Sequence, residues 1–197
     1  MSAIARSVDS LQKIYAVIIA LAIGNLANVV LRDLNEISEL DTVVPYLPVI
    51  LSFFLTIVPF YHGMNRHLDI CYIENEDSFS KGSLIFDFFI FSFEALSFLV
   101  LSFFIKTGLA AFAILGFILV FDTLWSYISH WTHYNHIKPT TRIWAYINAI
   151  TVCVGFLIYS LDFILNKEIL FLILFILRIF FDYKLGYRFY FPDSRKA

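Results

Sequence analysis

The chain has 197 residues, of which 60% are hydrophobic and only 15% are charged, and its formal net charge is −2. In a soluble domain about a quarter of the residues are charged, so this composition argues against an ordinary water-soluble fold. It contains no run of basic residues, which argues against nucleic-acid binding. Its two cysteines, Cys71 and Cys153, are too few and too far apart for a disulfide framework or a zinc finger. We therefore expect an integral membrane protein whose main partner is the lipid bilayer.

Six apolar runs follow one another along the chain. A helix needs about 20 mainly apolar residues to cross the bilayer core. The runs are continuous, whereas a membrane barrel would alternate apolar and polar residues. They cover residues 14–31, 43–61, 84–105, 109–128, 143–161 and 169–183. We predict one all-α domain over residues 1–197, a polytopic membrane protein with about six transmembrane helices.

The lysines and arginines between these runs predict the orientation. Loops on the cytoplasmic side carry an excess of these residues. Ten of the 14 lie on the side of the termini and three on the other side, while Arg178 lies inside a run. The three are Arg32, Lys106 and Lys167. We therefore expect both termini in the cytoplasm, with the protein in a plasma membrane or bacterial inner membrane.

Four ionisable residues lie inside the predicted spans: Asp87, Glu94, Asp122 and Arg178. Each charge at mid-bilayer costs at least about 2.5 kcal/mol, so each needs a partner or a wetted cavity. One interpretation is a structural ion pair between Glu94 and Arg178, with Asp182 as the alternative partner of Arg178. The other is a pathway for ions or protons.

Amide side chains also lie inside the spans. Asn25 and Asn28 fall in the first run, and Asn148 falls in the fifth. Amides in transmembrane helices commonly hydrogen-bond to neighbouring helices. We expect that role for them, with Asn25 and Asn28 as alternative members of a polar pathway.

The five histidines all fall outside the predicted spans, on the cytoplasmic side. His62 and His67 follow the second run, and His130 and His133 follow the fourth. If the fourth helix continues to Pro139, residues 130 and 133 lie three apart and can reach one metal ion. His62 or His67 could complete a zinc or iron site. The alternative is ordinary hydrogen bonding to headgroups, water or loop carbonyls.

A resemblance concerns the first third of the chain. The first span is followed by an acidic loop and by a second span with Leu51-Ser52-Phe53-Phe54 and an aromatic–histidine stretch. In this respect the chain resembles the start of the small six-helix potassium channels of endolysosomes and bacteria. Those channels carry a Phe-Ser-Asp signature at the start of the first helix, where this chain has Lys13-Ile14-Tyr15. The resemblance implies a cation channel.

These observations lead to three hypotheses for function. The first is a cation-preferring channel or pore-forming subunit, acting as a homo-oligomer, because little of the chain lies outside the membrane. The second is a metalloenzyme that uses the cytoplasmic histidines. The third is a membrane anchor or scaffold that recruits a soluble cytoplasmic partner.

Overall fold

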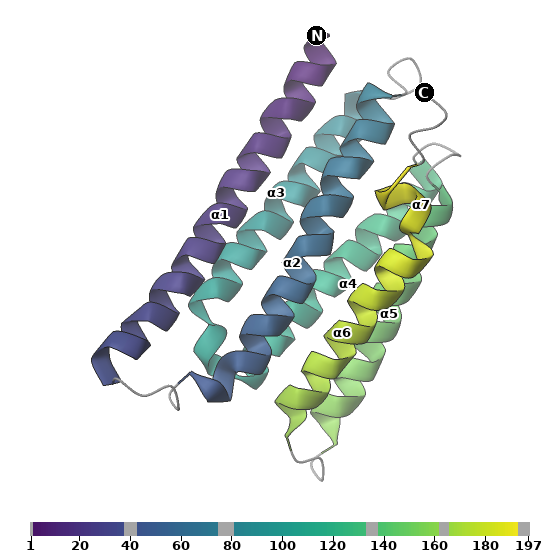
Figure 1. Ribbon diagram of the computed structural model, residues 1–197. Coiled ribbons are helices and arrows are strands. Elements are labelled where there is room, and N and C mark those ends of the chain that lie inside the picture. The colour runs from purple at the N-terminus through teal and green to yellow at the C-terminus, as the bar shows by residue number, and fades with distance from the viewer. Residues whose placement is uncertain (1, 38–42, 75–80, 133–137, 162–165, 193–197) are drawn as a thin grey trace.

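The computed structural model describes residues 2–37, 43–74, 81–132, 138–161 and 166–192 (Figure 1). Within these ranges the regular structure is entirely helical, which confirms the predicted all-α class. The six long helices are α1 (Ala3–Ile37), α2 (Leu47–Leu68), α3 (Lys81–Phe103), α4 (Leu109–Thr132), α5 (Lys138–Ser160) and α6 (Lys167–Leu185). The short elements are η2 (Val44–Tyr46), the π-helical turn η3 (Asp69–Ile73), η5 (Ile105–Thr107) and α7 (Tyr187–Tyr190).

Five of the long helices in the described part of the chain, α1 to α5, are long and apolar enough to cross a membrane. Helix α6 has the length but holds more charge. Its last 18 residues include Glu168, Arg178, Asp182 and Lys184. Whether α6 spans a membrane therefore depends on how those charges are accommodated by the neighbouring helices.

Two helices extend well beyond the apolar runs. Helix α1 begins at Ala3 rather than at residue 14, after Ser2, whose Oγ accepts a hydrogen bond from the Ala5 amide at 3.1 Å. An ion pair between Lys13 and Asp9 supports this first part. Hydropathy detects only the membrane-embedded part of a helix, and polar residues with good helix propensity continue it.

Helix α2 likewise continues past residue 61 and runs directly into η3. His62 and His67 therefore lie on a helix, which corrects the prediction that they follow the second span in a loop. The chain between Tyr61 and Ile73 contains no proline, and its single glycine, Gly63, lies within the helix, so the helix has no strong local signal to stop.

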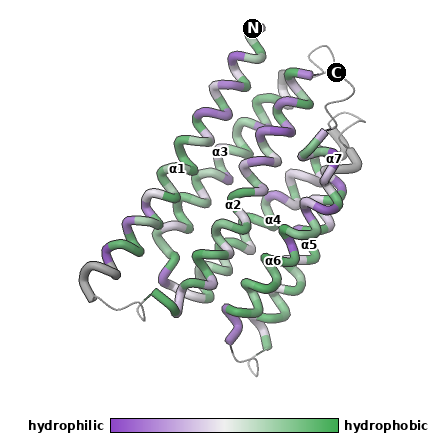
Figure 2. Tube along the Cα trace, in the orientation of Figure 1, coloured by the Kyte–Doolittle hydropathy of each residue, from purple (hydrophilic) through white to green (hydrophobic). Residues whose placement is uncertain are grey.

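The helices pack side by side in an elongated bundle (Figure 1). Helix α1 packs on α3, α2 on α6, and α5 on both α4 and α6. The beginning of α1 and the short α7 lie at the same end of the bundle, which is hereafter called the α7 end. Figure 2 shows hydrophobic residues along most of each long helix, with hydrophilic residues gathered mainly toward that end.

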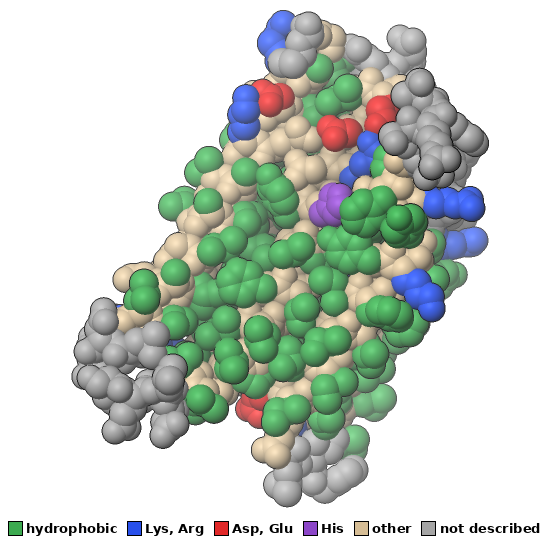
Figure 3. All heavy atoms as spheres, in the orientation of Figure 1, with side chains coloured by type: hydrophobic (Ala, Val, Ile, Leu, Met, Phe, Trp, Pro, Cys, Tyr) green, Lys and Arg blue, Asp and Glu red, His purple; other side chains and the backbone are tan. Residues whose placement is uncertain are grey.

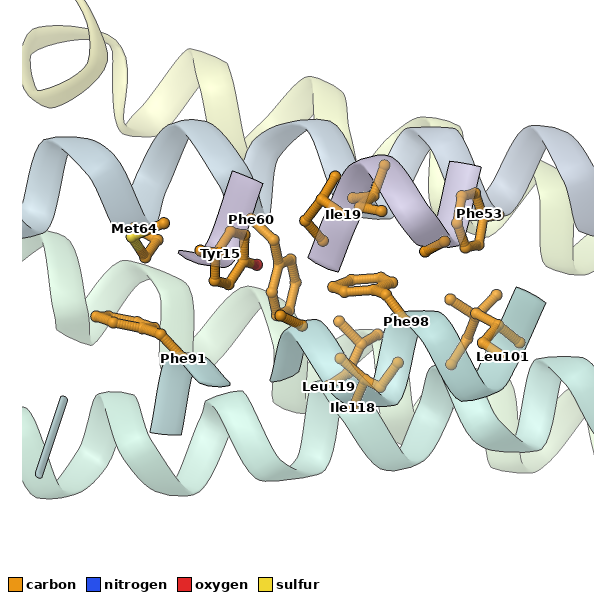
Figure 4. Close-up of a cluster of buried hydrophobic side chains, with 14 of the residues drawn as sticks. Tyr15, Ile19, Phe53, Phe60, Met64, Phe91, Phe98, Leu101, Ile118 and Leu119 are labelled. Atoms are coloured by element: carbon orange, nitrogen blue, oxygen red, sulfur yellow. The ribbon is translucent and has the colours of Figure 1, made fainter. Parts of the chain in front are cut away.

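Aromatic side chains form much of the core. Phe60 and Phe98 pack edge to face with ring centroids 5.4 Å apart, and Phe53 meets Phe98 in the same way at 6.1 Å (Figure 4). The outer surface is also apolar. Phe89 and Phe156 are each 68% exposed, and hydrophobic side chains cover the middle of the face seen in Figure 3. Apolar residues both inside and outside are what a lipid solvent requires.

Candidate functional site

A chain of polar side chains crosses the interior of the bundle from α3 to α6. Glu94 of α3 and Asp122 of α4 are both buried and line the same cavity. Asp122 accepts a hydrogen bond from the Asn148 amide of α5. The amide oxygen of Asn148 accepts a hydrogen bond from Arg178 Nε of α6 at 2.9 Å. One side chain from each of four successive helices therefore contributes to the network.

Asp182 extends the network toward the α7 end. It lies one helical turn after Arg178 on α6, and its Oδ1 accepts hydrogen bonds from Trp144 Nε1 at 3.1 Å and Tyr190 OH at 3.0 Å. Burial and the neighbouring Asp182 raise the pKa of the Tyr190 hydroxyl well above its usual range. Tyr190 therefore keeps its proton and donates a hydrogen bond to the Asp182 carboxyl group.

A small cavity of about 30 Å³ lies among these groups. Glu94, Asp122, Arg178 and Asp182 all line it, together with aromatic side chains that include Phe60. The Phe60 ring centroid is 5.2 Å from Arg178 Cζ, a cation–π contact. Two buried polar atoms have no hydrogen-bond partner, Glu94 Oε1 and Arg178 Nη1. Such a cavity is large enough for about one water molecule, which needs polar partners of this kind.

The direct ion pair predicted between Glu94 and Arg178 is not formed. Among the ion pairs of the described residues, neither Glu94 nor Asp182 lies within 4.0 Å of Arg178. Arg178 reaches the acidic groups through Asn148 instead. Helical spacing gives the depth of a residue but not the rotation of each helix about its axis, and that rotation points the Nε of Arg178 at α5.

Asp87 belongs to a separate cluster. It accepts hydrogen bonds from Tyr72 OH at 2.7 Å and Trp125 Nε1 at 3.0 Å, and its Oδ2 lies 2.9 Å from His67 Nε2. Cys71 Sγ is 3.6 Å from the same His67 nitrogen. Asp87 and Glu94 share a face of α3, but seven residues separate them by about 10.5 Å of helix. Phe91 and Trp125 pack together between the two clusters.

The π-helical turn η3 helps to build this second cluster. It supplies Cys71 and Tyr72, both buried, directly after His67 of α2. A π turn shifts the register of the residues that follow it, so they point differently than an unbroken α-helix would direct them. Such turns are frequent at functional sites.

Among the histidines predicted as metal ligands, the structure describes the side chains of His62 and His67 only. His62 and His67 lie five positions apart on α2, which separates them by about 140° around the helix. His62 Nδ1 is 3.3 Å from Tyr183 OH of α6, whereas His67 faces Asp87 of α3. His133 lies outside the described residues, and the side chain of His130 is not described either. The described residues contain no group of three or more His, Cys, Asp or Glu that could hold a metal ion.

The two asparagines of the first predicted span, Asn25 and Asn28, differ in their surroundings. Asn25 donates a hydrogen bond to Ser102 Oγ of α3 at 3.0 Å, whereas Asn28 is exposed on the outer side of α1. Asn25 therefore joins two helices, and neither residue lines the cavity.

Sequence reasoning did not identify Tyr190 or the tryptophans Trp125 and Trp144 as members of these clusters. Tryptophans near span ends are commonly interface anchors, but the indole N–H groups of Trp125 and Trp144 point inward to Asp87 and Asp182. The sequence did contain one signal for this part of the site: Asp182 lies one helical turn after Arg178 and therefore on the same face of the helix.

No protein-family model, curated protein or solved structure matches this chain.

Proposed function

We propose that this protein conducts small cations across a membrane through the interior of its helix bundle, with α6 as a sixth span and both termini in the cytoplasm. One observation carries the proposal: three carboxyl groups and a guanidinium are buried around a water-sized cavity inside the bundle. Ionisable groups inside a membrane bundle are costly, and they commonly mark the route of an ion or a proton.

The burial of these groups favours a route within one chain. Glu94 is 2% exposed, Asp122 is 8% exposed and Asp87 is fully buried. Carboxylates that form a selectivity ring between subunits would have to face a shared axis. A homo-oligomer of such chains would then contain one route in each subunit rather than one central pore.

The position of α6 supports its role as a span. Its charged residues Arg178 and Asp182 point inward, where Asn148, Trp144 and Tyr190 provide hydrogen bonds. Its apolar residues, such as Phe180 and Ile173, remain exposed on the outside. Two of the charged residues that lower the hydropathy of α6 would thus face the bundle interior and be hydrogen-bonded there, away from lipid.

Reconstitution tests the proposal. Purified protein in liposomes with a salt gradient should show a reversal potential that favours cations over anions. Glu94→Gln should lower this preference because it removes an acidic group from the buried site. Ser97→Ala is the matched control on the same helix, since Ser97 is partly exposed and its hydroxyl donates to the Phe93 carbonyl one turn earlier. Bilayers that remain silent under voltage, pH and ligand screens would overturn the proposal.

A further inference from the structure

A groove with a volume of about 500 Å³ lies between α5 and α6. Its walls are mostly apolar, and they extend from Ile143 to Val154 on α5 and from Leu174 to Leu185 on α6. Arg178 belongs to the inner wall, where its side chain is buried. An apolar cavity of about 150 Å³ is large enough to hold benzene, so this groove has room for a longer hydrocarbon.

The length of the groove matches one half of a bilayer. Residues 143 and 154 on α5, and residues 174 and 185 on α6, are eleven positions apart. Eleven residues of α-helix are about 16.5 Å long. The hydrocarbon core of a bilayer is about 30 Å thick, so each leaflet contributes about 15 Å. A single acyl chain from one leaflet could therefore lie along the whole groove.

Three cations lie at the α7 end of this groove. Arg142 directly precedes the first groove residue of α5, Lys184 directly precedes the last groove residue of α6, and Arg188 follows in α7. All three side chains are exposed. None of them forms an ion pair with an acidic residue in the part of the chain that the structure describes. Figure 3 shows Lys and Arg side chains gathered beside α7 and the end of α6.

Other charges at the α7 end have partners of opposite sign. Lys13 pairs with Asp9 on α1, and Arg66 of α2 pairs with Glu74 after η3. Asp182 of α6 points inward, where its carboxyl group accepts two hydrogen bonds. The end of the α5–α6 groove is therefore bordered by positive charge that these carboxyl groups do not balance.

We propose that the groove between α5 and α6 binds one anionic phospholipid. An acyl chain of this lipid lies along the apolar walls, and its headgroup lies among Arg142, Lys184 and Arg188. Anionic lipids of the cytoplasmic leaflet are attracted to basic clusters at the ends of membrane helices, and the α7 end is the end proposed to be cytoplasmic. The inference goes beyond the proposed function and shares with it only the orientation of the bundle, with α6 as a span.

Native mass spectrometry in mild detergent tests the headgroup site. The protein is titrated with phosphatidylglycerol and, separately, with phosphatidylcholine that has the same acyl chains. Wild-type protein should bind its first phosphatidylglycerol about tenfold more tightly or better, since each surface Lys or Arg contributes on the order of fivefold. Lys184→Gln should weaken phosphatidylglycerol binding by about fivefold. Combining it with Arg142→Gln and Arg188→Gln should remove the preference for the anionic lipid.

Lys13→Gln is the matched control for charge. It removes one exposed cation from the same end of the bundle, but on α1, where Lys13 pairs with Asp9. It should leave the affinity for phosphatidylglycerol unchanged. Glycerol phosphate, which has an anionic head but no acyl chain, should not compete with the lipid.

A second pair of variants tests the apolar part of the site. Ile147 is half-buried in the wall of the groove. Ile147→Trp should fill the groove and weaken lipid binding by about tenfold or more, because the loss of even two buried methylenes has an effect of that size. Ile173→Trp is the control, since Ile173 is 47% exposed on α6 and lies outside the groove. It should leave lipid binding unchanged.

Several results would overturn the proposal. Equal affinities of the wild-type protein for the two lipids would do so, as would equal losses for Lys184→Gln and Lys13→Gln or for Ile147→Trp and Ile173→Trp. Competition by glycerol phosphate would show that the cations bind a soluble anion without the groove. A dimer that excludes phosphatidylglycerol would assign the groove to a second copy of the chain.

The lipid site and cation conduction fail separately, because lipid binding is measured without ion flow. If liposomes remain silent while phosphatidylglycerol binding and its response to Lys184→Gln hold, cation conduction is wrong and the lipid site stands. If cations flow but the two lipids bind equally, conduction stands and the lipid site is wrong.

Discussion

At the residue scale, Asp87 illustrates how a carboxylate is accommodated inside a membrane bundle. It is fully buried, and groups from three separate segments converge on its two oxygens: His67, Tyr72 and Trp125. A buried carboxylate with several hydrogen-bond partners contributes to stability, because its removal leaves those donors buried without an acceptor.

We expect Asp87→Ala to destabilise the protein by about 3–5 kcal/mol. The substitution breaks the buried His67–Asp87 pair and leaves the Tyr72 hydroxyl and the Trp125 indole N–H without their acceptor. Thermal unfolding in mild detergent would measure the loss. Phe89→Ala, two residues away on the lipid-facing side of α3, is the control and should change stability far less. Similar losses for the two variants would show that the Asp87 cluster is not a stabilising element.

The hydrogen bond between Arg178 and Asn148 predicts that the two residues are coupled energetically. A double-mutant cycle with Arg178→Met and Asn148→Leu should show a coupling energy of about 0.5–3 kcal/mol, as residues in one hydrogen-bond network do. Asn25→Leu, whose amide serves the α1–α3 contact instead, is the comparison and should add to Arg178→Met. Additivity in both cycles would mean that the amide bridge contributes nothing to stability.

At the element scale, the junction between α6 and α7 determines where Tyr190 lies. Gly186 occupies this junction, and a Cβ atom there would lie 2.8 Å from the Asp182 carbonyl oxygen and 3.0 Å from the Tyr190 ring. The first of these is closer than any real Cβ approaches backbone. Only glycine therefore allows α7 to fold back so that Tyr190 reaches Asp182.

Gly186→Ala should displace α7 and lower stability by about 1–3 kcal/mol, the usual cost of overpacking. Gly24→Ala is the matched control, because a Cβ at Gly24 has no neighbour within 4 Å. Alanine also favours a helix over glycine by about 1 kcal/mol, so this control should hold or raise the unfolding temperature. A harmless Gly186→Ala would show that α7 has freedom to move.

At the scale of the whole molecule, the decisive issue is whether α6 crosses the membrane. The beginning of α1 and α7 lie at one end of the bundle, whereas the α3–α4 turn and the start of α6 lie at the other (Figure 1). If the bundle axis is parallel to the membrane normal, the chain begins and ends on the same side of the membrane, and the number of spans is even. The excess of Lys and Arg at the α7 end predicts that this end is cytoplasmic.

Cysteine labelling tests this topology. In a background with Cys71 and Cys153 replaced by Ala, a cysteine at Ser10 or Arg188 should react only from the cytoplasmic side. A cysteine at Thr107 or Lys167 should react only from the opposite side. If positions 167 and 188 label from the same side, α6 does not span the membrane and the six-helix arrangement is wrong.

The sequence by itself determined the helical class, the approximate helix positions and the identity of the costly polar residues. Membrane-spanning helices depend on the local run of apolar side chains, because each helix satisfies its own backbone hydrogen bonds. The prediction was weakest where a helix continues beyond its apolar run, as in α1 and α2, since hydropathy does not register polar helical turns.

Only the tertiary structure decided which polar residues meet. Glu94, Asp122 and Arg178 line one cavity, while Asp87, on the same face of α3 as Glu94, joins His67 in another cluster. Arg178 bonds to Asn148 rather than to Glu94. Such partnerships depend on the rotation of each helix about its axis and on which helices are neighbours. Contacts between residues far apart in the chain determine the rotation of each helix and its neighbours. The residue pattern within one helix does not predict these contacts.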